Sequence, residues 1–313
     1  MSNPGYTRAM QRSYEYTVLD VFAEQALEGN PLAVFHDARG LSDEEMQALA
    51  RETRLSETTF ILPTDDEPGA VRVRIFTTEE ELPFAGHPTL GTASWLYQNH
   101  PTLRGAQQIT LQLNVGPIPV HFPPHEQHGN GVFGSMRQND PVFGGTYSPD
   151  EVAPVLGLAP EEIDARFLPQ SVSTGNAFCI VLLKSLDSLQ RLAIPQALAS
   201  PWLRERGMRW FYVLAPTGQE GEFRTRMQFY SGEDPATGSA AGPAVAWLVA
   251  NGLLAPDAPC RFLQGVEMLR PSLLLGRAQK QADTVYGIDI AGRTISVAMG
   301  RYFLPGTGTY AQG

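Results

Sequence analysis

ELPFAGHPTLGTASW (residues 81–95) decides the organisation of this chain, because a second copy, EDPATGSAAGPAVAW, follows at residues 233–247. Extended to Asn99 and Asn251, the two copies share six identities in 19 positions at a constant offset of 152 residues. The identical pairs are Glu81/Glu233, Pro83/Pro235, Gly86/Gly238, Trp95/Trp247, Leu96/Leu248 and Asn99/Asn251. Each copy has the pattern of a loop that leads into an apolar helix. The repeat therefore predicts two similar halves, each built around one helix.

The start of each predicted helix has the features of an anion-binding site. The first N–H groups of a helix have no partner within the helix, and the helix dipole places partial positive charge there. Two such ends can hold one small acid between them. The alternative is two ordinary helix starts in a glycine-rich protein. The register of the repeat, which continues through Trp, Leu and Asn along the helix, favours the shared site.

Composition and length indicate two globular domains. The 313 residues fit two domains of ~150 residues, and the 152-residue offset gives the same division. The net charge of −10 argues against nucleic acid or an anionic membrane as a partner. The N-terminal residues have no apolar core of a signal peptide, and no apolar run is long enough to span a bilayer. We expect a soluble, cytoplasmic protein that binds neither nucleic acid nor membrane.

Strand patterns dominate the rest of the chain, with no regular alternation of strands and helices. SDEE (42–45) is a capping box and SPDE (148–151) places Ser at an N-cap before Pro, so both predict helix starts. We expect residues 1–14 to form a disordered tail. The polar, Pro- and Gly-rich residues 123–130 are the best candidate for a domain boundary. The two long helices are apolar nearly all round, which indicates burial inside a curved sheet.

Three polar residues at or near the helix starts, and Glu57 at the start of a predicted strand, are candidates for chemistry. His87 lies in a first turn, where the dipole favours the neutral imidazole that can donate and accept a proton, although a capping role is equally open. Ser239 occupies the matching position and can bind a carboxylate or cap the helix. Asp234 precedes the second helix, as a site residue or a loop residue. The pattern around Glu57 alone favours a solvated carboxylate.

Metal and thiol chemistry find little support in the residues. His121, His125 and His128 cluster, but their exposed, proline-rich setting disfavours a metal site. The two cysteines, Cys179 and Cys260, make neither a disulfide scaffold nor a zinc site, and neither lies at a helix start.

Five stretches together resemble the PhzF-type phenazine-biosynthesis isomerase family, whose fold is related to that of diaminopimelate epimerase. They are GNP (29–31), SETTF (56–60), FTTEEELPFAGHPTLG (76–91), GEDPATGSAAG (232–242) and QGVEMLRPS (264–272). The resemblance covers nearly the whole chain past residue 15. It implies an α+β fold of two pseudo-symmetric domains, each a curved mixed β-sheet wrapped around a central α-helix, with the active site between them. It also implies that the final strand returns to the first domain.

From this resemblance we expect an N-terminal domain of residues 1–128 plus 299–313 and a C-terminal domain of residues 129–298. The essential acid–base Glu of the family falls on Glu57, and its His and Asp fall on His87 and Asp234. The expected substrate-binding residues are Ser56, Gly86, Gly238, Ser239, Asn30 and Gly175. The cysteine pair of diaminopimelate epimerase is absent, because His87 and Ser239 stand at those two helix starts, which argues against two-thiol racemisation.

The resemblance implies an isomerase that needs no cofactor and no metal, acts on a small carboxylate substrate and is commonly a homodimer. The reaction that gives the family its name moves a proton within trans-2,3-dihydro-3-hydroxyanthranilate. Two alternatives stay open. One is an amino-acid epimerase or racemase that uses Glu57 and a partner, and the other is a non-catalytic protein that binds a small acid.

Overall fold

The computed structural model describes residues 11–63, 70–229 and 232–306. The strands of the first half are β1 (Arg12–Val21), β2 (Asn30–Phe35), β3 (Glu57–Leu62), β4 (Ala70–Phe76), β5 (Glu81–Leu82), β6 (Gln108–Leu113), β7 (Gly116–His121) and β8 (Val132–Arg137). Those that follow are β9 (Val142–Thr146), β10 (Gln170–Ser173), β11 (Ala177–Leu182), β12 (Trp210–Pro216), β13 (Glu222–Arg226), β14 (Gln228–Phe229), β15 (Gly232–Glu233), β16 (Cys260–Gln264), β17 (Ser272–Gln281) and β18 (Thr284–Leu304). The α-helices are α1 (Asp43–Thr53), α2 (Gly86–Asn99), α3 (Pro149–Leu156), α4 (Leu186–Gln190), α5 (Gln196–Glu205) and α6 (Gly238–Ala250).

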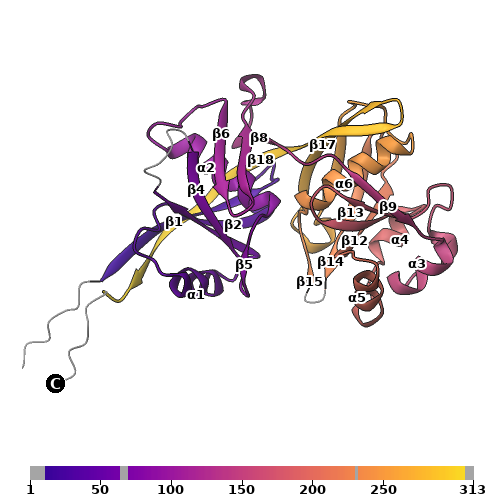
Figure 1. Ribbon diagram of the computed structural model, residues 1–313, viewed down its shortest axis with the longest axis horizontal. Coiled ribbons are helices and arrows are strands. Elements are labelled where there is room, and N and C mark those ends of the chain that lie inside the picture. The colour runs from indigo at the N-terminus through magenta and orange to yellow at the C-terminus, as the bar shows by residue number, and fades with distance from the viewer. Residues whose placement is uncertain (1–10, 64–69, 230–231, 307–313) are drawn as a thin grey trace, which may run out of the picture.

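In the first half of the chain a mixed sheet closes on itself around α2 (Figure 1). Its strand order is β1-β2-β3-β4-β6-β7-β8-β18, and β18 pairs back with β1. The pairs β2–β3 and β4–β6 are parallel, whereas the others in this ring are antiparallel. Every residue of α2 from Gly86 to Ser94 is buried. Such a helix needs apolar or small residues on all sides, as its sequence provides.

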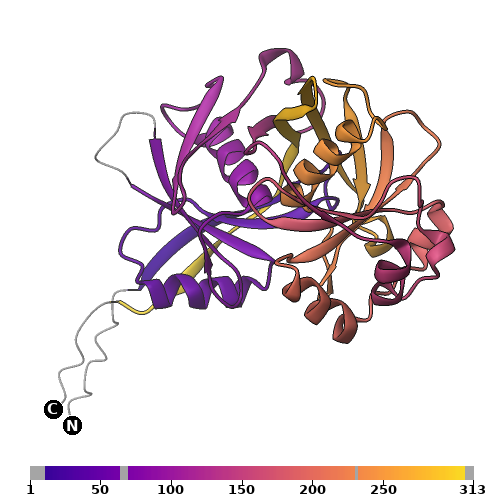
Figure 2. The ribbon, with the colours of Figure 1, turned by 45° about the vertical axis from the view of Figure 1, so that its right-hand side comes forward.

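The second half repeats this arrangement around α6. The sheet continues from β18 through β17, β16, β13, β12, β11 and β10 to β9. All residues of α6 except Ser239 and Ala250 are buried, and Trp247 is fully enclosed. Figure 2 shows each of the two inner helices surrounded by the strands of its own half. The predicted α+β fold, a curved mixed sheet around a central helix in each half, is confirmed.

The two copies of the sequence repeat have the same local structure. A short strand, β5 or β15, is followed by a helix that begins at Gly86 or Gly238. Near the other end of each helix, the side-chain amide of Asn99 or Asn251 donates to the carbonyl of the Trp four residues earlier, at 2.9 Å in both cases. The identities in the repeat therefore mark residues with the same structural role.

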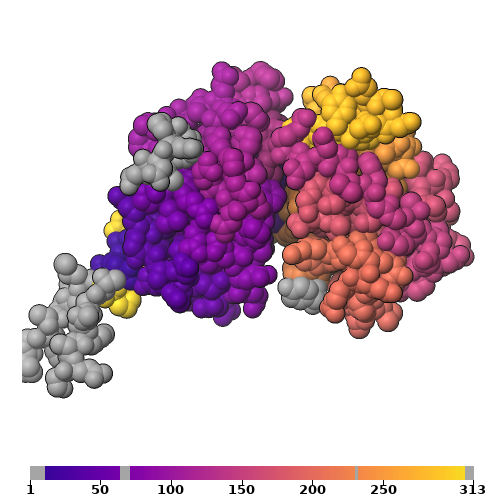
Figure 3. Space-filling view, in the orientation of Figure 1, coloured from indigo at the N-terminus to yellow at the C-terminus, as the bar shows by residue number. Residues whose placement is uncertain are grey.

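The helices α2 and α6 meet at their N-terminal ends. A Cβ atom added to Gly86 would lie 3.4 Å from the backbone nitrogen of Ser239 and 3.6 Å from the carbonyl carbon of Gly238. The prediction that the two helices begin at one shared place is confirmed. Seen from outside, a groove separates the two halves on the face shown in Figure 3.

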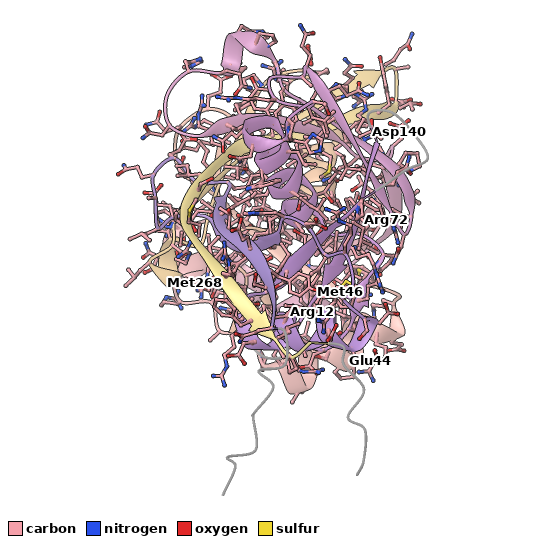
Figure 4. The ribbon with its side chains drawn as sticks, turned by 90° about the vertical axis from the view of Figure 1, so that its left-hand side faces the viewer. Arg12, Glu44, Met46, Arg72, Asp140 and Met268 are labelled. Atoms are coloured by element: carbon pink, nitrogen blue, oxygen red, sulfur yellow. The ribbon has the colours of Figure 1, made fainter. Side chains whose placement is uncertain are left out.

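Several expectations for the ends of elements need correction. Residues 12–14 belong to β1 and not to a tail, because Arg12 forms an ion pair with Glu45 and a hydrogen bond to Gly40, which hold this end of the strand against α1 (Figure 4). Residues 1–10 of that expected tail lie outside the described residues. The sequence pattern predicts separate strands near residues 285–290 and 294–299, whereas the structure has one 21-residue strand, β18. The helices α4 and α5 were not anticipated.

Other details follow the sequence closely. Both α1 and α3 begin with the expected Ser caps, and each forms a full capping box. The apolar residues around Cys179 predict a buried strand, and Cys179 is buried in β11. Cys260 follows Pro259, which predicts a loop, but it is buried at the start of β16. The division into residues 1–128 plus 299–313 and residues 129–298 stays a prediction, and residues 307–313 lie outside the described chain.

Candidate active site

The helix starts that meet between the two halves differ from those on the outside. The outer helices α1 and α3 begin with Ser side-chain caps and acidic first turns. In the described chain, neither Ala85 nor Thr237, the N-cap residues of α2 and α6, makes a side-chain capping hydrogen bond, and neither first turn contains an acidic residue. The N–H groups and dipole ends of both inner helices can therefore serve an anion that enters between them.

Glu57 and His87 come together beside these helix starts. Glu57 begins β3 and His87 is the second residue of α2. The carboxylate oxygen Oε2 of Glu57 lies 3.5 Å from Nε2 of His87, and the two side chains are 17% and 7% exposed. Both atoms are buried, and neither has a hydrogen-bond partner among the described residues. A buried, unsatisfied pair of this kind costs stability, which is typical of a functional site.

Burial shifts the pKa of both groups strongly. Loss of water, together with the negative charge of Asp234, raises the pKa of Glu57 from 4.5 to about 8. Burial lowers the pKa of His87 from 6.5 to about 3, so that its imidazole is neutral near pH 7. A carboxyl group whose pKa lies close to neutrality is well matched to taking up and returning a proton.

Asp234 is held by hydrogen bonds from both halves of the protein. Its oxygen Oδ1 accepts from the side-chain amide of Asn30 at 2.7 Å, and Oδ2 accepts from the hydroxyl of Thr237 at 2.7 Å. Burial raises the pKa of Asp234 to about 6, although these hydrogen bonds favour its ionised form. With both oxygens engaged, Asp234 is less free than Glu57 to accept a further proton.

The fully buried Asn30 links the two halves at this point. Its amide nitrogen also donates to the carbonyl of Ala236 at 3.1 Å, so both amide hydrogens point to the loop before α6. Its oxygen Oδ1 is buried with no partner among the described residues. Asn30 therefore positions Asp234 and presents an acceptor beside it.

The remaining predicted residues lie at different distances from this centre. Gly86, Gly238 and Ser239 are the adjoining helix-start residues described above. Ser56 is exposed and directly precedes Glu57. Gly175 is exposed in the turn between β10 and β11, with a φ of +149° that favours glycine. The structure thus brings Glu57, His87, Asp234, Asn30 and the helix starts together, and places Ser56 and Gly175 at the surface.

Two glutamines support the site, and neither was among the site residues predicted from the sequence. Gln264 is fully buried, and its amide donates to the carbonyl of Asp234 and the hydroxyl of Thr237, both at 2.8 Å. Gln138 donates to the carbonyl of Gly238 at 2.8 Å and accepts from Thr174 at 2.6 Å. Gln264 opens one of the five family-like stretches, which is a signal that could have found it. The polar setting of Gln138 gives no such signal.

Two structural features that could point to another function are absent from the described residues. Within residues 11–63, 70–229 and 232–306, no three His, Cys, Asp or Glu side chains gather as ligands for a metal ion. In the same part of the chain, no helix combines the length and apolarity needed to cross a bilayer.

Comparison with known proteins relates this arrangement to a family. Residues 19–300 match the PhzC-PhzF family, described as phenazine biosynthesis-like protein. A trans-2,3-dihydro-3-hydroxyanthranilate isomerase from Pseudomonas aeruginosa is 35% identical over 298 residues, which cover 93% of this chain and 100% of that protein. A solved structure from the same organism, described as a predicted epimerase, is 36% identical with a TM-score of 0.78, and the match covers 92% of this chain and 99% of that one. A hydroxyproline epimerase from Agrobacterium vitis, 11% identical, shares the fold with a TM-score of 0.63 over 95% of this chain and 93% of its own.

Proposed function

We propose a mechanism from the premise that this chain belongs to the phenazine biosynthesis-like protein family and is an isomerase of the PhzF type. In this proposal Glu57 takes a proton from one carbon of a small carboxylic acid and returns it to another carbon of the same molecule. The observation that carries it is the mostly buried Glu57 carboxyl, whose pKa is about 8 and whose Oε2 atom faces His87 at the meeting point of two helix starts.

The helix starts would hold the carboxylate of the substrate. Backbone N–H groups at Gly86, Gly238 and Ser239 lie close together and carry the positive ends of two helix dipoles. When a proton leaves a carbon conjugated with the carboxylate, negative charge spreads onto the carboxylate oxygens. Donors that already point at those oxygens stabilise this charge without reorganisation.

Glu57 acts as a base in the first step and as an acid in the second. Its ionised carboxylate takes the carbon-bound proton, and the electron pair of that C–H bond moves into the conjugated system of the substrate. The protonated Glu57 then gives the same proton to a different carbon, so the product is an isomer and the enzyme returns to its starting state. Isolation of the groove from water would keep the proton from exchanging between the two steps.

His87 and Asp234 have supporting roles in this proposal. Neutral His87 can donate a hydrogen bond to the substrate or to ionised Glu57, because its Nε2 atom lies 3.5 Å from that carboxylate. Asp234 raises the pKa of Glu57 through its charge and is itself fixed by Asn30 and Thr237. Asp234 therefore orients and tunes the site.

We propose trans-2,3-dihydro-3-hydroxyanthranilate, the substrate named for relatives about 35% identical, as the first compound to test. The purified protein is incubated with this compound, and the change in ultraviolet absorption is followed together with the mass of the product. An absorption change with no change in mass supports isomerisation. An unaltered spectrum contradicts this substrate when the enzyme of a named relative, used as a control, converts the compound in the same assay.

An amino-acid epimerase is the second candidate, because the similar structure with 36% identity is described as a predicted epimerase. Inversion at carbon by two bases needs a second base on the opposite face of the substrate. His87 lies on the same side as Glu57, and both oxygens of Asp234 already accept hydrogen bonds. These contacts favour a single base. Chiral chromatography of amino acids after incubation tests the alternative, since only an epimerase produces the opposite enantiomer.

We further propose that the protein works without metal or cofactor and as a homodimer. Metal analysis of a chelator-treated, active sample and light scattering after gel filtration test these two statements. Activity that requires an added metal ion would contradict the first, and a monomeric mass would contradict the second.

A further inference from the structure

The sequence repeat contains a second feature, an ion pair before each inner helix. Arg74 of β4 donates to Glu81 through Nε at 2.8 Å and Nη2 at 2.6 Å. Arg226 of β13 donates to Glu233 through the same two atoms at the same distances. Both residues of the pair keep the offset of 152. Each bidentate pair therefore closes the turn that leads, five residues after the Glu, to a helix start of the active site.

The two ion pairs are anchored differently. Arg74 also pairs with the exposed Asp43 of α1, and Glu81 accepts a hydrogen bond from Asn114. Arg226 is buried, and its third nitrogen, Nη1, donates to three backbone carbonyls at the end of α4 and just after it. These carbonyls belong to Leu189, Gln190 and Leu192, at 2.9, 3.0 and 2.9 Å. The second pair is thus fixed to the body of its half.

The residue that follows each Glu decides what the pair can position. In the first copy this residue is Leu82, and in the second it is Asp234. The backbone N–H of Asp234 donates to the carbonyl of Met227 at 3.0 Å, so a backbone bond lies directly beside the Arg226–Glu233 pair. Any displacement of that pair moves the main chain that carries the Asp234 carboxylate.

We propose that Arg226 is a positioning residue of the active site: through Glu233 and the adjoining backbone bond, it holds the Asp234 carboxylate opposite Glu57. The inference rests on the proposed role of Glu57. A bidentate Arg–carboxylate pair fixes orientation as well as distance, which a single point charge cannot do. The pair in the first half is followed by Leu82 and not by an active-site carboxylate, so it provides a matched control within the same chain.

The charged groups around Glu57 and Asp234 determine how loosening the Arg226–Glu233 pair would change the pKa of Glu57. Glu57 faces the charge of Asp234 and the neutral imidazole of His87. Asp234 faces the charge of Glu233 and accepts hydrogen bonds from Asn30 and Thr237. A carboxylate released from a fixed position moves away from a like charge. Loosening Arg226 is therefore expected to lower the pKa of Glu57.

The test compares Arg226→Lys with Arg74→Lys in the full-length protein. Lysine keeps the positive charge and loses the forked geometry in both variants. Glutamate side-chain carboxyls are labelled with ¹³C, and the Glu57 signal is identified by its absence in Glu57→Gln. Its chemical shift is then followed against pH by NMR, a measurement that needs no substrate. Thermal unfolding of both variants measures their general loss of stability.

We expect the Glu57 midpoint of Arg226→Lys to fall by roughly half a pH unit or more, since Coulomb energy changes steeply with distance at short range. Arg74→Lys also loses its bidentate pair and should keep the wild-type midpoint. Equal midpoints in Arg226→Lys and wild type, or equal displacement in both Lys variants, would overturn the positioning role and leave Arg226 a purely structural residue.

Gln228→Leu supplies a milder variant if Arg226→Lys fails to fold. Gln228 donates to Glu233 Oε2 at 3.1 Å, so its loss loosens the same pair without a change in charge. Its Glu57 midpoint should fall in the same direction, and an unchanged midpoint in this variant counts against the inference. Absence of turnover in the wild-type protein would instead refute the proposed substrate, because the NMR titration is independent of activity.

Discussion

Glu57→Gln should make the protein more stable as well as inactive, and the gain should depend on pH. The pKa of Glu57 rises from 4.5 to about 8 on folding, and its side chain is only 17% exposed. Each pKa unit corresponds to about 1.4 kcal/mol, so ionising Glu57 in the folded protein costs up to about 5 kcal/mol more than in the unfolded chain. Glutamine keeps the shape of the side chain and cannot ionise.

The raised pKa of Glu57 determines how its contribution to stability changes with pH. Below pH 4.5 Glu57 is protonated in both states, and its contribution to stability is fully present. As the pH rises towards 8, the unfolded chain releases this proton before the folded protein does, and stability is lost. Between pH 5 and pH 8 the advantage of Glu57→Gln over wild type should therefore grow by up to about 4 kcal/mol.

Urea unfolding at several pH values measures this difference, with Glu80→Gln as the matched control. Glu80 is exposed, so this variant controls for the exchange of a Glu for a Gln without a change in the buried site. The same Glu57→Gln sample should lose turnover by ~10²–10⁴, the usual contribution of a general acid–base group, while still binding the substrate. A stability difference that stays flat or shrinks with rising pH would refute the buried, high-pKa carboxyl.

Three further predictions concern the neighbours of this group. Asp234→Asn removes the charge that adds to the effect of burial on the pKa of Glu57. The midpoint of the increase in kcat/KM with pH, which is near 8 in the wild type, should therefore fall. An unchanged pH profile would contradict this coupling. Gly86→Ala would place a methyl carbon 3.4 Å from the backbone nitrogen of Ser239, so KM should rise about tenfold or more. The melting temperature should change little, because Ala favours a helix over Gly. Steady-state kinetics with unchanged KM would exclude this crowded position as the carboxylate site. Burial lowers the pKa of His87 to about 3, so its ring carbon proton signal should show no titration between pH 5 and pH 8 in NMR, and a midpoint near 6.5 would contradict its burial.

The sequence predicted the architecture well because the repeat is a physical signal. Identical Gly and Asn residues at one offset recur where the backbone starts a helix and where a side chain bonds near its end, and these needs are the same in both halves. The identical Trp residues both pack in or against the hydrophobic core, Trp247 fully buried and Trp95 partly buried. The Ser caps of α1 and α3 were equally readable, since a capping box is a local interaction. Local patterns could not show that β18 is one long strand, because its length is set by pairing with β1, β8 and β17.

The chemistry was less accessible to the sequence pattern. The residues around Glu57 favour a solvated carboxylate, and only the resemblance to a family singled it out. Glu57 packs beside His87 of α2, and the charge of Asp234 adds to the effect of burial on its pKa; both residues are far away in the chain. Gln138 escaped notice for the same reason, because its partner is the backbone carbonyl of Gly238 in a distant part of the chain. Arg226 and Glu233 are close in sequence, but the backbone carbonyls that fix Arg226 lie in an earlier segment, at Leu189, Gln190 and Leu192.

Hydrogen exchange at carbon tests the central claim most directly. Wild-type protein, Glu57→Gln and Glu80→Gln are incubated with trans-2,3-dihydro-3-hydroxyanthranilate in D₂O, and carbon-bound deuterium in substrate and product is followed by NMR and mass spectrometry. Because isolation of the groove slows but does not forbid exchange of the Glu57 proton with solvent, we predict isomerisation by wild type and Glu80→Gln in which most turnovers keep the substrate's own hydrogen. Deuterium should therefore accumulate at the two exchanging carbons only slowly, over repeated turnover. Glu57→Gln should bind the compound but show neither isomerisation nor exchange. Exchange by Glu57→Gln at the wild-type rate would contradict the assignment of the transferred proton to Glu57.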